Sequence, residues 1–507
     1  MIGAILYSEN NDFSVNLINS DDFKKNIDVK CIIASDVKIE TLKNKFPKID
    51  IISTGDFERC KINFINENIK NLPDDKNSNL FSSIESECIK LLDFANANHN
   101  RFSLIDSRRT FTTGYEFVLN FLDHYSPELL IFTNTPHSFQ SYLMFKICEI
   151  LKIKTLFKRE LSWPDTYIFQ NKIENSFVDT NFFNKNTKVR KILSGHIKNI
   201  INFKQNEIKK IFSKKRNHKL VHGGIIYKNI FLFVTLIFLK KIPILFLKYF
   251  RDLFYAYIKK DHKYLFSRDF LKEKNKTYQD STTSSIGMNF EYILSDLRKF
   301  NLLNYYKKNL HKVEDEENYI YFPLHYQPEA TTYPFGKNFI DQVKAIKLLS
   351  FYLKDYKIYV KEHNDTFNIS HLAWAKGDYT RSKKFYDEIL KIKNVRFLDL
   401  KLNSLKLIKN SKAVATISGA AGLESLLLGK PTLIFGYPWF HHFDEVFSFN
   451  NKNNLKDSLD KYMKKKIFVS KTIKNINSMS KNIFLKQDLH NQDNFNYVSE
   501  IFIKSVK

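Results

Sequence analysis

The chain has 507 residues and a formal net charge of +26, and 43% of its residues are hydrophobic. This length predicts two or three domains that each bury a core, and the apolar content excludes a disordered chain. The basic residues are spread along the chain without zinc-finger or RNA-binding spacing. We therefore expect acidic substrates or an anionic membrane surface as partners, and no nucleic acid.

The cysteines and the N-terminus indicate the compartment. The four cysteines include no Cys-x-x-Cys pair, so they predict neither a disulfide framework nor a metal cluster and are typical of a reducing cytoplasm. The first apolar run, Ile2 to Tyr7, lacks a basic leader. It is typical of a buried strand and not of a signal peptide. We expect a cytoplasmic protein.

Residues 1–189 alternate short apolar runs with helical patterns. This alternation predicts an N-terminal Rossmann-like domain with a parallel sheet. The expected helix is Phe139–Leu151, and the expected strands are Ile2–Tyr7, Lys30–Ala34, Leu129–Asn134 and Lys154–Phe157.

Two polar segments of this domain follow expected strands and should face a cleft. The first contains His137, and the second contains Glu160 and Asp165. Any of the three could act as a general base that deprotonates a hydroxyl group. A lone polar residue at a strand end is more often a cap or a surface contact, so the three are alternatives.

Residues 190–310 are rich in Lys, Phe and Tyr and predict a mainly helical insertion. The apolar run Ile230–Leu239 is shorter than the about 20 residues that span a bilayer, and Lys240, Lys241 and Pro243 separate it from the next run. One interpretation is a buried helical hairpin. The other is a segment on an anionic membrane surface, with the neighbouring basic residues against the headgroups.

The alternation returns over residues 311–507 and predicts a C-terminal Rossmann-like domain. We expect a helix within Asn338–Asp355 and strands at Tyr319–Leu324, Lys357–Lys361, Val395–Leu398, Ala413–Ile417 and Pro431–Phe435. The predicted fold class is α/β, with two Rossmann-like domains facing a cleft where ligands commonly bind.

Two segments after these strands carry side chains suited to a donor site. His325, Gln327 and Glu329 lie in a loop stiffened by two prolines. The alternative for this loop is a structural linker between the domains. Lys361 and His363 lie at the end of the second strand, where they could neutralise and hydrogen-bond a phosphate. The alternative for them is a polar surface loop.

The strongest segment runs from Ser418 to Glu424, between an apolar strand and an apolar helix. Because Ser418, Gly419 and Gly422 are small, a phosphate could approach the helix N-terminus, where free amides and the helix dipole favour an anion. The carboxylate of Glu424 could accept hydrogen bonds from a ribose. The alternative is a tight turn whose small residues serve only close packing.

Two motifs are missing from the sequence. There is no Asp-x-Asp pair, which favours a phosphate site that uses no metal ion. There is also no Gly-x-x-x-x-Gly-Lys-Ser/Thr loop, which argues against a P-loop NTPase.

Several segments together resemble the bacterial capsular polysaccharide biosynthesis proteins, a family that includes the Kdo transferases of capsule assembly. The resemblance covers the last third of the chain and, loosely, the N-terminal domain. It departs from the His-Pro pair of related enzymes where Asn364 follows His363. The similar segments are Tyr321–Thr331, Val360–His363, Arg381–Tyr386, Ser418–Glu424, Gly429–Pro431 and Thr135–Ser138.

The resemblance implies a GT-B fold and a metal-independent glycosyltransferase of the hexosyl or Kdo type. The N-terminal domain, residues 1–189, would then bind the acceptor, and the C-terminal domain, residues 311–507, would bind the donor nucleotide. The donor would be a nucleotide sugar, CMP-Kdo-like or UDP-linked; because it is a substrate, we expect no cofactor. The acceptor would be a growing surface polysaccharide or a lipid-linked glycan, at the inner face of the cytoplasmic membrane. Two alternatives are a sugar-nucleotide epimerase of the same architecture and a non-catalytic polysaccharide assembly protein.

Overall fold

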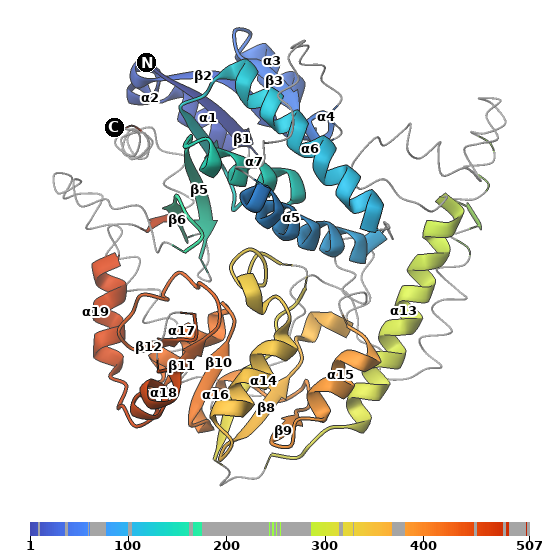
Figure 1. The fold of residues 1–507 in the computed structure, drawn as a ribbon, viewed down its shortest axis with the longest axis vertical. Helices are drawn as coiled ribbons and strands as arrows, with labels where there is room; N and C mark the ends of the chain where they lie inside the picture. The colour runs from blue at the N-terminus through green and yellow to red at the C-terminus, as the bar shows by residue number, and fades with distance from the viewer. Residues whose placement is uncertain are drawn as a thin grey trace.

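The chain forms two α/β domains, each with its own sheet (Figure 1). The structure, a computed structural model, describes residues 1–8, 11–35, 39–58, 60, 78–99, 104–161, 166–174, 285–313, 318–327, 329–367, 381–450, 454–479 and 483–485, and the single residues Pro243, Phe246, Leu247, Phe250, Phe254 and Ile503.

The N-terminal sheet has seven strands within the described residues, in the order β13-β6-β5-β4-β1-β2-β3. Strands β1 to β5 are parallel, and β6 and β13 are antiparallel additions at one edge. Their bounds are β1 (Ile2–Ser8), β2 (Ile27–Ala34), β3 (Asp50–Ser53), β4 (Leu129–Phe132), β5 (Lys154–Glu160), β6 (Thr166–Gln170) and β13 (Phe484–Leu485).

Helices cover both faces of this sheet. Along β1, Ile5 and Tyr7 pack into a core shared with α5 to α7, whereas Ala4 and Leu6 pack into a core on the opposite face. Burial of both faces explains why the strands are continuous apolar runs. The helices are α1 (Asn11–Asn19), α2 (Asp21–Asn26), α3 (Ile39–Lys45), α4 (Thr54–Glu58), α5 (Ser78–His99), α6 (Leu104–Tyr125) and α7 (Phe139–Ile150).

The C-terminal sheet is parallel throughout its described strands, in the order β12-β11-β10-β7-β8-β9. This is the Rossmann strand order, in which the chain reverses direction across the sheet between the neighbouring strands β7 and β10. The bounds are β7 (Tyr319–Pro323), β8 (Lys357–Lys361), β9 (Val395–Phe397), β10 (Ala413–Thr416), β11 (Thr432–Ile434) and β12 (Val446–Ser448).

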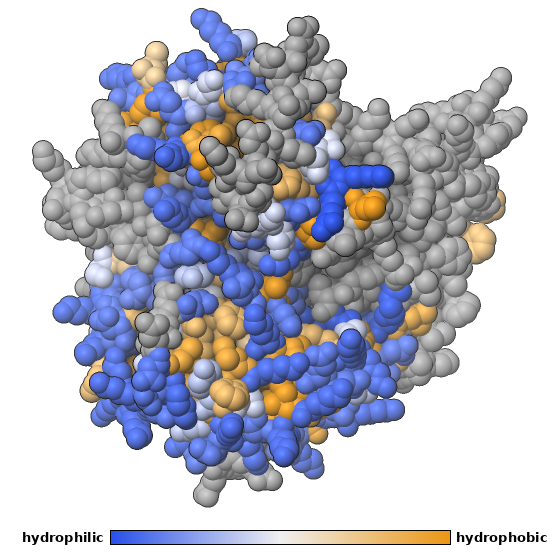
Figure 2. Space-filling model, in the orientation of Figure 1, coloured by the Kyte–Doolittle hydropathy of each residue, from blue (hydrophilic) through white to orange (hydrophobic). Residues whose placement is uncertain are grey.

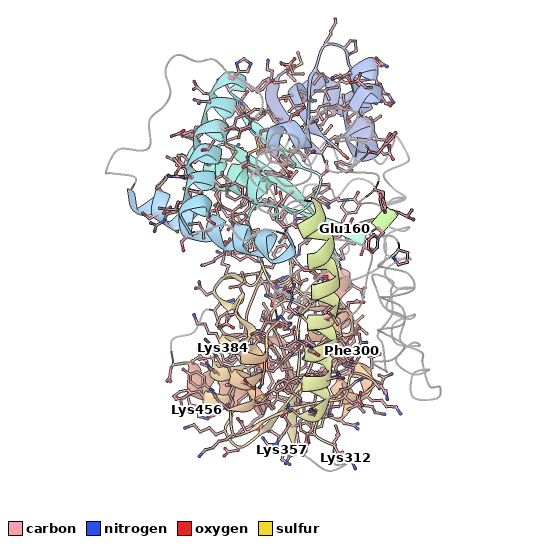
Figure 3. All side chains as sticks on the ribbon, turned by 90° about the vertical axis from the view of Figure 1, so that its right-hand side faces the viewer. Glu160, Phe300, Lys312, Lys357, Lys384 and Lys456 are labelled. Carbon is pink, nitrogen blue, oxygen red and sulfur yellow. The ribbon has the colours of Figure 1, made fainter. Side chains whose placement is uncertain are left out.

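The helices of this domain include one that we expected in the insertion. Figure 3 shows α13 (Ser285–Lys308), which carries Phe300, running along the side of the C-terminal domain. Its Leu303 and Tyr306 belong to the core of that domain. The other helices are α14 (Gln342–Tyr352), α15 (Lys383–Leu390), α16 (Ser404–Asn410), α17 (Ala420–Leu427), α18 (Leu455–Met463) and α19 (Val469–Met479), with 3-10 turns at Lys337–Phe339 and Asn364–Phe367.

The predicted α/β fold with two Rossmann-like domains is confirmed. The predicted strands and helices of both domains are present, with some ends shifted; Lys357–Lys361, for example, keeps its predicted bounds. The end of the chain differs from the expectation of a C-terminal domain over 311–507, because β13 pairs with β6 in the N-terminal sheet. Residues 190–284, most of the expected insertion, lie outside the described residues apart from five single positions.

Among the described helices, none combines the length and the apolar character needed to cross a bilayer.

Candidate active site

Ligands of this fold commonly bind at the carboxyl ends of the two strands where the chain reverses direction, here β7 and β10. We call this region the crevice, and a buried histidine lies within it. His325 follows β7, and its Nε2 lies 3.0 Å from Oγ1 of Thr416 and accepts a 3.2 Å hydrogen bond from the amide of Ile417, which follows β10. Burial lowers the pKa of His325 to about 3, so the ring is neutral. Since Nε2 is the acceptor, the proton is on Nδ1. His325 thus joins the two loops at the point where this fold commonly binds ligands.

The glycines after β10 are packed against this crevice. A Cβ on Gly419 would lie 2.6 Å from Cε1 of His325, and one on Gly422 would lie 2.9 Å from Cζ of Phe440. Any larger residue would displace these rings. The absence of a side chain therefore serves close packing, which is the alternative that the sequence left open for Gly419 and Gly422.

The N-terminus of α17 has both occupied and open donors. The hydroxyl of Ser418 donates to the carbonyl of Thr331, and the amide of Gly419 donates to Oγ1 of Thr416. The amides of Ala420 and Ala421 have no acceptor among the described residues. These two amides, rather than Ser418 or Gly419, are the donors that a phosphate would meet first.

Lys361 lies at the end of β8 on the face that α16 covers. Its ammonium group is almost fully buried and donates to Oγ of Ser404 at 3.1 Å. The hydroxyl of Tyr321 reaches the same oxygen, and the nearby carboxylate of Glu424 adds to the effect of burial in raising the pKa of Tyr321. Burial lowers the pKa of Lys361 to about 8. Lys361 and Glu424 are thus brought to one side of the crevice.

A buried ion pair lies on the other side. Nε of Arg381 is 2.7 Å from Oε2 of Glu362, and neither side chain is exposed. Tyr386 and Thr366 also donate to this carboxylate, and so does the amide of His363. With this many donors, the charge of Glu362 is fully compensated and its carboxylate has no capacity for a ligand.

The same guanidinium group holds the loop after β7. Arg381 donates to the carbonyl of His325 at 2.7 Å and to Oε1 of Gln327 at 2.8 Å. Gln342 donates to both of these oxygens as well. The side chain of Gln327 is therefore a buried part of this network, whereas the sequence predicted that it binds the donor directly. Arg381 was noted only for the family resemblance, and nothing local in the sequence indicates its partners.

His363 is the exposed member of this region. Its side chain is 38% exposed, Nδ1 accepts a hydrogen bond from the amide of Asp365, and the ring lies 5.8 Å from that of Tyr326. Burial is the main cause of a lowered pKa, and the charge of Asp365 opposes it. In the neutral ring the proton is then on Nε2, which can donate to an anion.

Glu329 lies in the loop that contacts the N-terminal domain. Its Oε2 accepts a 3.2 Å hydrogen bond from Thr331, and its carbonyl accepts one from Thr332. The next residue, Tyr333, packs into the N-terminal core and donates to the carbonyl of Glu87. This loop joins the domains, as the linker interpretation expects, while His325 within it faces the crevice.

The candidate bases of the N-terminal domain follow neighbouring strands. His137 is exposed, and its Nδ1 lies 2.7 Å from the carbonyl of Thr135, so Nε2 carries the lone pair that a base requires. The side chain of Glu160, at the end of β5, is 67% exposed and lies 3.5 Å from Nζ of Lys158. Figure 3 places Glu160 at the level between the two domains. Asp165 lies outside the described residues.

Arg159 connects the two domains. Its guanidinium group lies 3.5 Å from the ring centroid of Phe335 and donates to the carbonyl of Tyr437, which follows β11. Burial lowers the pKa of Arg159 to about 9, and its charge adds to burial in lowering the pKa of His441. The carboxyl ends of β5 and β11 therefore face each other. Nothing local in the sequence indicates that Arg159 and His441 lie near each other across the two domains.

No cluster of His, Cys, Asp and Glu within the described residues has an arrangement suited to a metal ion.

The C-terminal domain matches a known family. Residues 337–444, which contain His363, Arg381 and the Ser418–Glu424 segment, match the model of the capsule polysaccharide biosynthesis proteins. This part of the chain is similar to the capsule polysaccharide biosynthesis proteins. The family resemblance seen in the sequence is thus confirmed for this part of the chain. His325 precedes the matched residues, which we call the capsule-family segment, and contacts this segment at Thr416 and Ile417.

Comparisons with solved structures give only weak matches. KpsC beta Kdo 2,7 transferase from Thermosulfurimonas dismutans is 9% identical, with a TM-score of 0.29, over 76% of this chain and 88% of that one. The UDP-GlcNAc 2-epimerase from Methanocaldococcus jannaschii is 11% identical, with a TM-score of 0.23, over 94% and 99% of the two chains. Such values carry no argument about activity. No curated protein matches the sequence of the chain significantly.

Proposed function

We propose that the protein is a glycosyltransferase that moves a sugar from a nucleotide-sugar donor to a growing glycan. The observation that carries this proposal is the crevice between β7 and β10. There, the capsule-family segment presents the N-terminus of α17 beside His325, whose ring is close enough to His363 to be affected by its charge. Open amides and a histidine donor at a topological switch point suit the diphosphate or monophosphate of a nucleotide sugar.

The donor would be held by groups on both sides of the crevice. The amides of Ala420 and Ala421 and Nε2 of His363 would donate to phosphate oxygens. The ammonium group of Lys361 would neutralise phosphate charge after turning from Ser404, to which it now donates. Glu424 would accept hydrogen bonds from the ribose. These donors stabilise the leaving phosphate without a metal ion or a cofactor.

The acceptor hydroxyl would be deprotonated from the N-terminal domain. His137 is our first choice, because its Nδ1 is directed to the carbonyl of Thr135 and Nε2 is left to accept a proton. Glu160 and Asp165 are the alternatives. The acceptor would be a surface polysaccharide or a lipid-linked glycan at the inner face of the cytoplasmic membrane, and the donor a CMP-Kdo-like or UDP-linked sugar.

Two measurements on the purified full-length protein test the proposal. Calorimetric titration with CMP, UDP and GDP should reveal a nucleotide that binds. Incubation with the matching sugar nucleotides and a glycan acceptor should then give a transferred sugar. An isomerised sugar nucleotide would identify an epimerase instead. If no sugar nucleotide is bound or converted, the result would favour a non-catalytic assembly protein and contradict the proposal.

A further inference from the structure

Four exposed apolar side chains form a stripe in the basic middle part of the chain. Phe246, Leu247, Phe250 and Phe254 are 58%, 70%, 62% and 63% exposed, although each is in a helical conformation. We call these four residues the apolar stripe. The chain does not bury them, so they contradict, for this stretch, the interpretation of the middle segment as a buried hairpin.

The spacing of the stripe is that of one helix face. The four positions follow one another in steps of one, three and four. On a helix with about 100° per residue, this spacing would place them within roughly a third of the circumference. Figure 2 shows hydrophobic side chains at the right-hand edge of the molecule. Exposed apolar surface that is gathered on one face is a common sign of a binding surface.

The sequence around the stripe carries positive charge. Lys248 and Arg251 lie between the stripe residues, and Lys240, Lys241, Lys259 and Lys260 lie within a few residues on either side. Over residues 240–260 the only acidic residue is Asp252. An apolar stripe with this strong basic excess is complementary to an anionic membrane surface, which offers apolar chains beneath negative headgroups. A second copy of this chain would present the same positive charge and would be repelled.

We propose that the apolar stripe is a membrane-docking surface that inserts into the headgroup region of an anionic bilayer. Docking would place the crevice of the proposed transferase near a lipid-linked acceptor. The proposal rests on the proposed function only for that consequence, because membrane binding needs neither nucleotide nor acceptor.

The test uses full-length protein and vesicles without any substrate. The parent protein should co-sediment with vesicles of phosphatidylglycerol and phosphatidylcholine and bind phosphatidylcholine alone much more weakly, since each basic residue near an anionic surface contributes about fivefold in affinity. Salt should weaken binding without abolishing it. The triple variant Phe246→Ser, Leu247→Ser, Phe254→Ser should lose on the order of a hundredfold in affinity. Phe351→Ser, which changes an equally exposed phenylalanine of the C-terminal domain, should bind as the parent does.

A second pair of variants keeps the test valid if the triple variant does not fold. Phe254→Trp retains an apolar ring, and brominated lipids should quench the added fluorescence, whereas Phe351→Trp should show no added quenching. A parent that does not bind anionic vesicles would overturn the proposal. A folded triple variant that binds vesicles like the parent would also overturn it. So would a parent protein that is dimeric and does not bind vesicles, if the triple variant is monomeric. Transfer to a water-soluble acceptor is measured separately, so failure of docking and failure of the transferase proposal are distinguishable.

Discussion

Nε of Arg381 lies 2.7 Å from Oε2 of Glu362, and both side chains are completely buried. This pair joins three segments that are separate in the sequence, because Arg381 also donates to the carbonyl of His325 and to Gln327. The carboxylate, in turn, accepts the amide of His363. The pair therefore sets the positions of both histidines at the crevice.

Breaking this pair should be strongly destabilising. Glu362→Gln leaves the guanidinium group of Arg381 buried without a negative charge, so we expect the free energy of unfolding to fall by about 3–5 kcal/mol. Urea denaturation measures this change. Asp460→Asn breaks the exposed pair between Lys456 and Asp460 and should cost no more than about 0.5 kcal/mol. Equal effects of the two variants would contradict this account of the buried pair.

Replacement of Glu424 by alanine should weaken nucleotide binding. If the carboxylate accepts hydrogen bonds from the ribose, each lost bond reduces the binding free energy by about 1.5–3 kcal/mol. Calorimetric titration with the nucleotide that binds the parent measures the loss. Glu388→Ala, at a half-buried position of α15 where the carboxylate pairs with Lys347, is the control and should bind normally. Unchanged affinity in a folded Glu424→Ala variant would remove this residue from the proposed site.

Nucleotide affinity should depend on the protonation of Lys361. Burial lowers its pKa from 10.5 to about 8, so the ammonium group that would attract a phosphate is lost as the pH rises above about 8. We expect affinity to fall over this range, by at most about tenfold per pH unit. The stability of the nucleotide-free protein should change in the opposite direction and rise with pH. The unfolded chain holds this proton more tightly, so the contribution of Lys361 to stability increases from about pH 8 towards 10.5.

The variant Lys361→Met should remove the pH dependence of binding. Lys357→Met, at the other end of β8 and labelled at the base of the domain in Figure 3, should retain it. Binding titrations at several pH values above 7 measure both variants. Affinity in the parent that stays constant up to about pH 10 would show that Lys361 does not contact the phosphate.

The variant His137→Ala should reduce turnover more than donor binding. A general base typically contributes about a hundred- to ten-thousand-fold to the rate, and we expect a loss in this range with little change in nucleotide affinity. Steady-state kinetics of sugar transfer and nucleotide titration separate the two effects. His124→Ala, an exposed histidine at the end of α6, should behave like the parent. Near-normal turnover of His137→Ala would direct attention to Glu160 and Asp165.

Removal of metal ions should leave sugar transfer intact. The proposed site stabilises the leaving phosphate with the amides of α17, His363 and Lys361, which need no metal ion. Transfer rates before and after treatment with EDTA test this expectation. Loss of activity that magnesium or manganese restores would contradict the metal-independent mechanism.

The sequence by itself determined the two sheets and the loops that follow their strands. Strand Lys357–Lys361 could be predicted from its own residues, because the alternation of apolar runs with helical patterns is a local property. The parallel direction of most strands follows from the same alternation, since parallel neighbours require crossover connections. The carboxyl end of β8 could therefore be recognised as part of a ligand crevice before any contact was known. The order of the strands in each sheet is seen only in the structure.

Only the tertiary structure decided what the side chains in those loops do. Arg381 and Glu362 are separated by 19 positions, and only the packing of three segments buries both charges together. Gly419 has no side chain and so leaves room for the ring of His325, which follows a different strand. In the sequence, the apolar residues around Phe254 are equally consistent with a buried core and with an exposed surface, because periodicity defines a face of a helix but not what covers it. For Arg381 and Gly419, the deciding contact involves residues that are distant in the chain and become neighbours only when the domains fold.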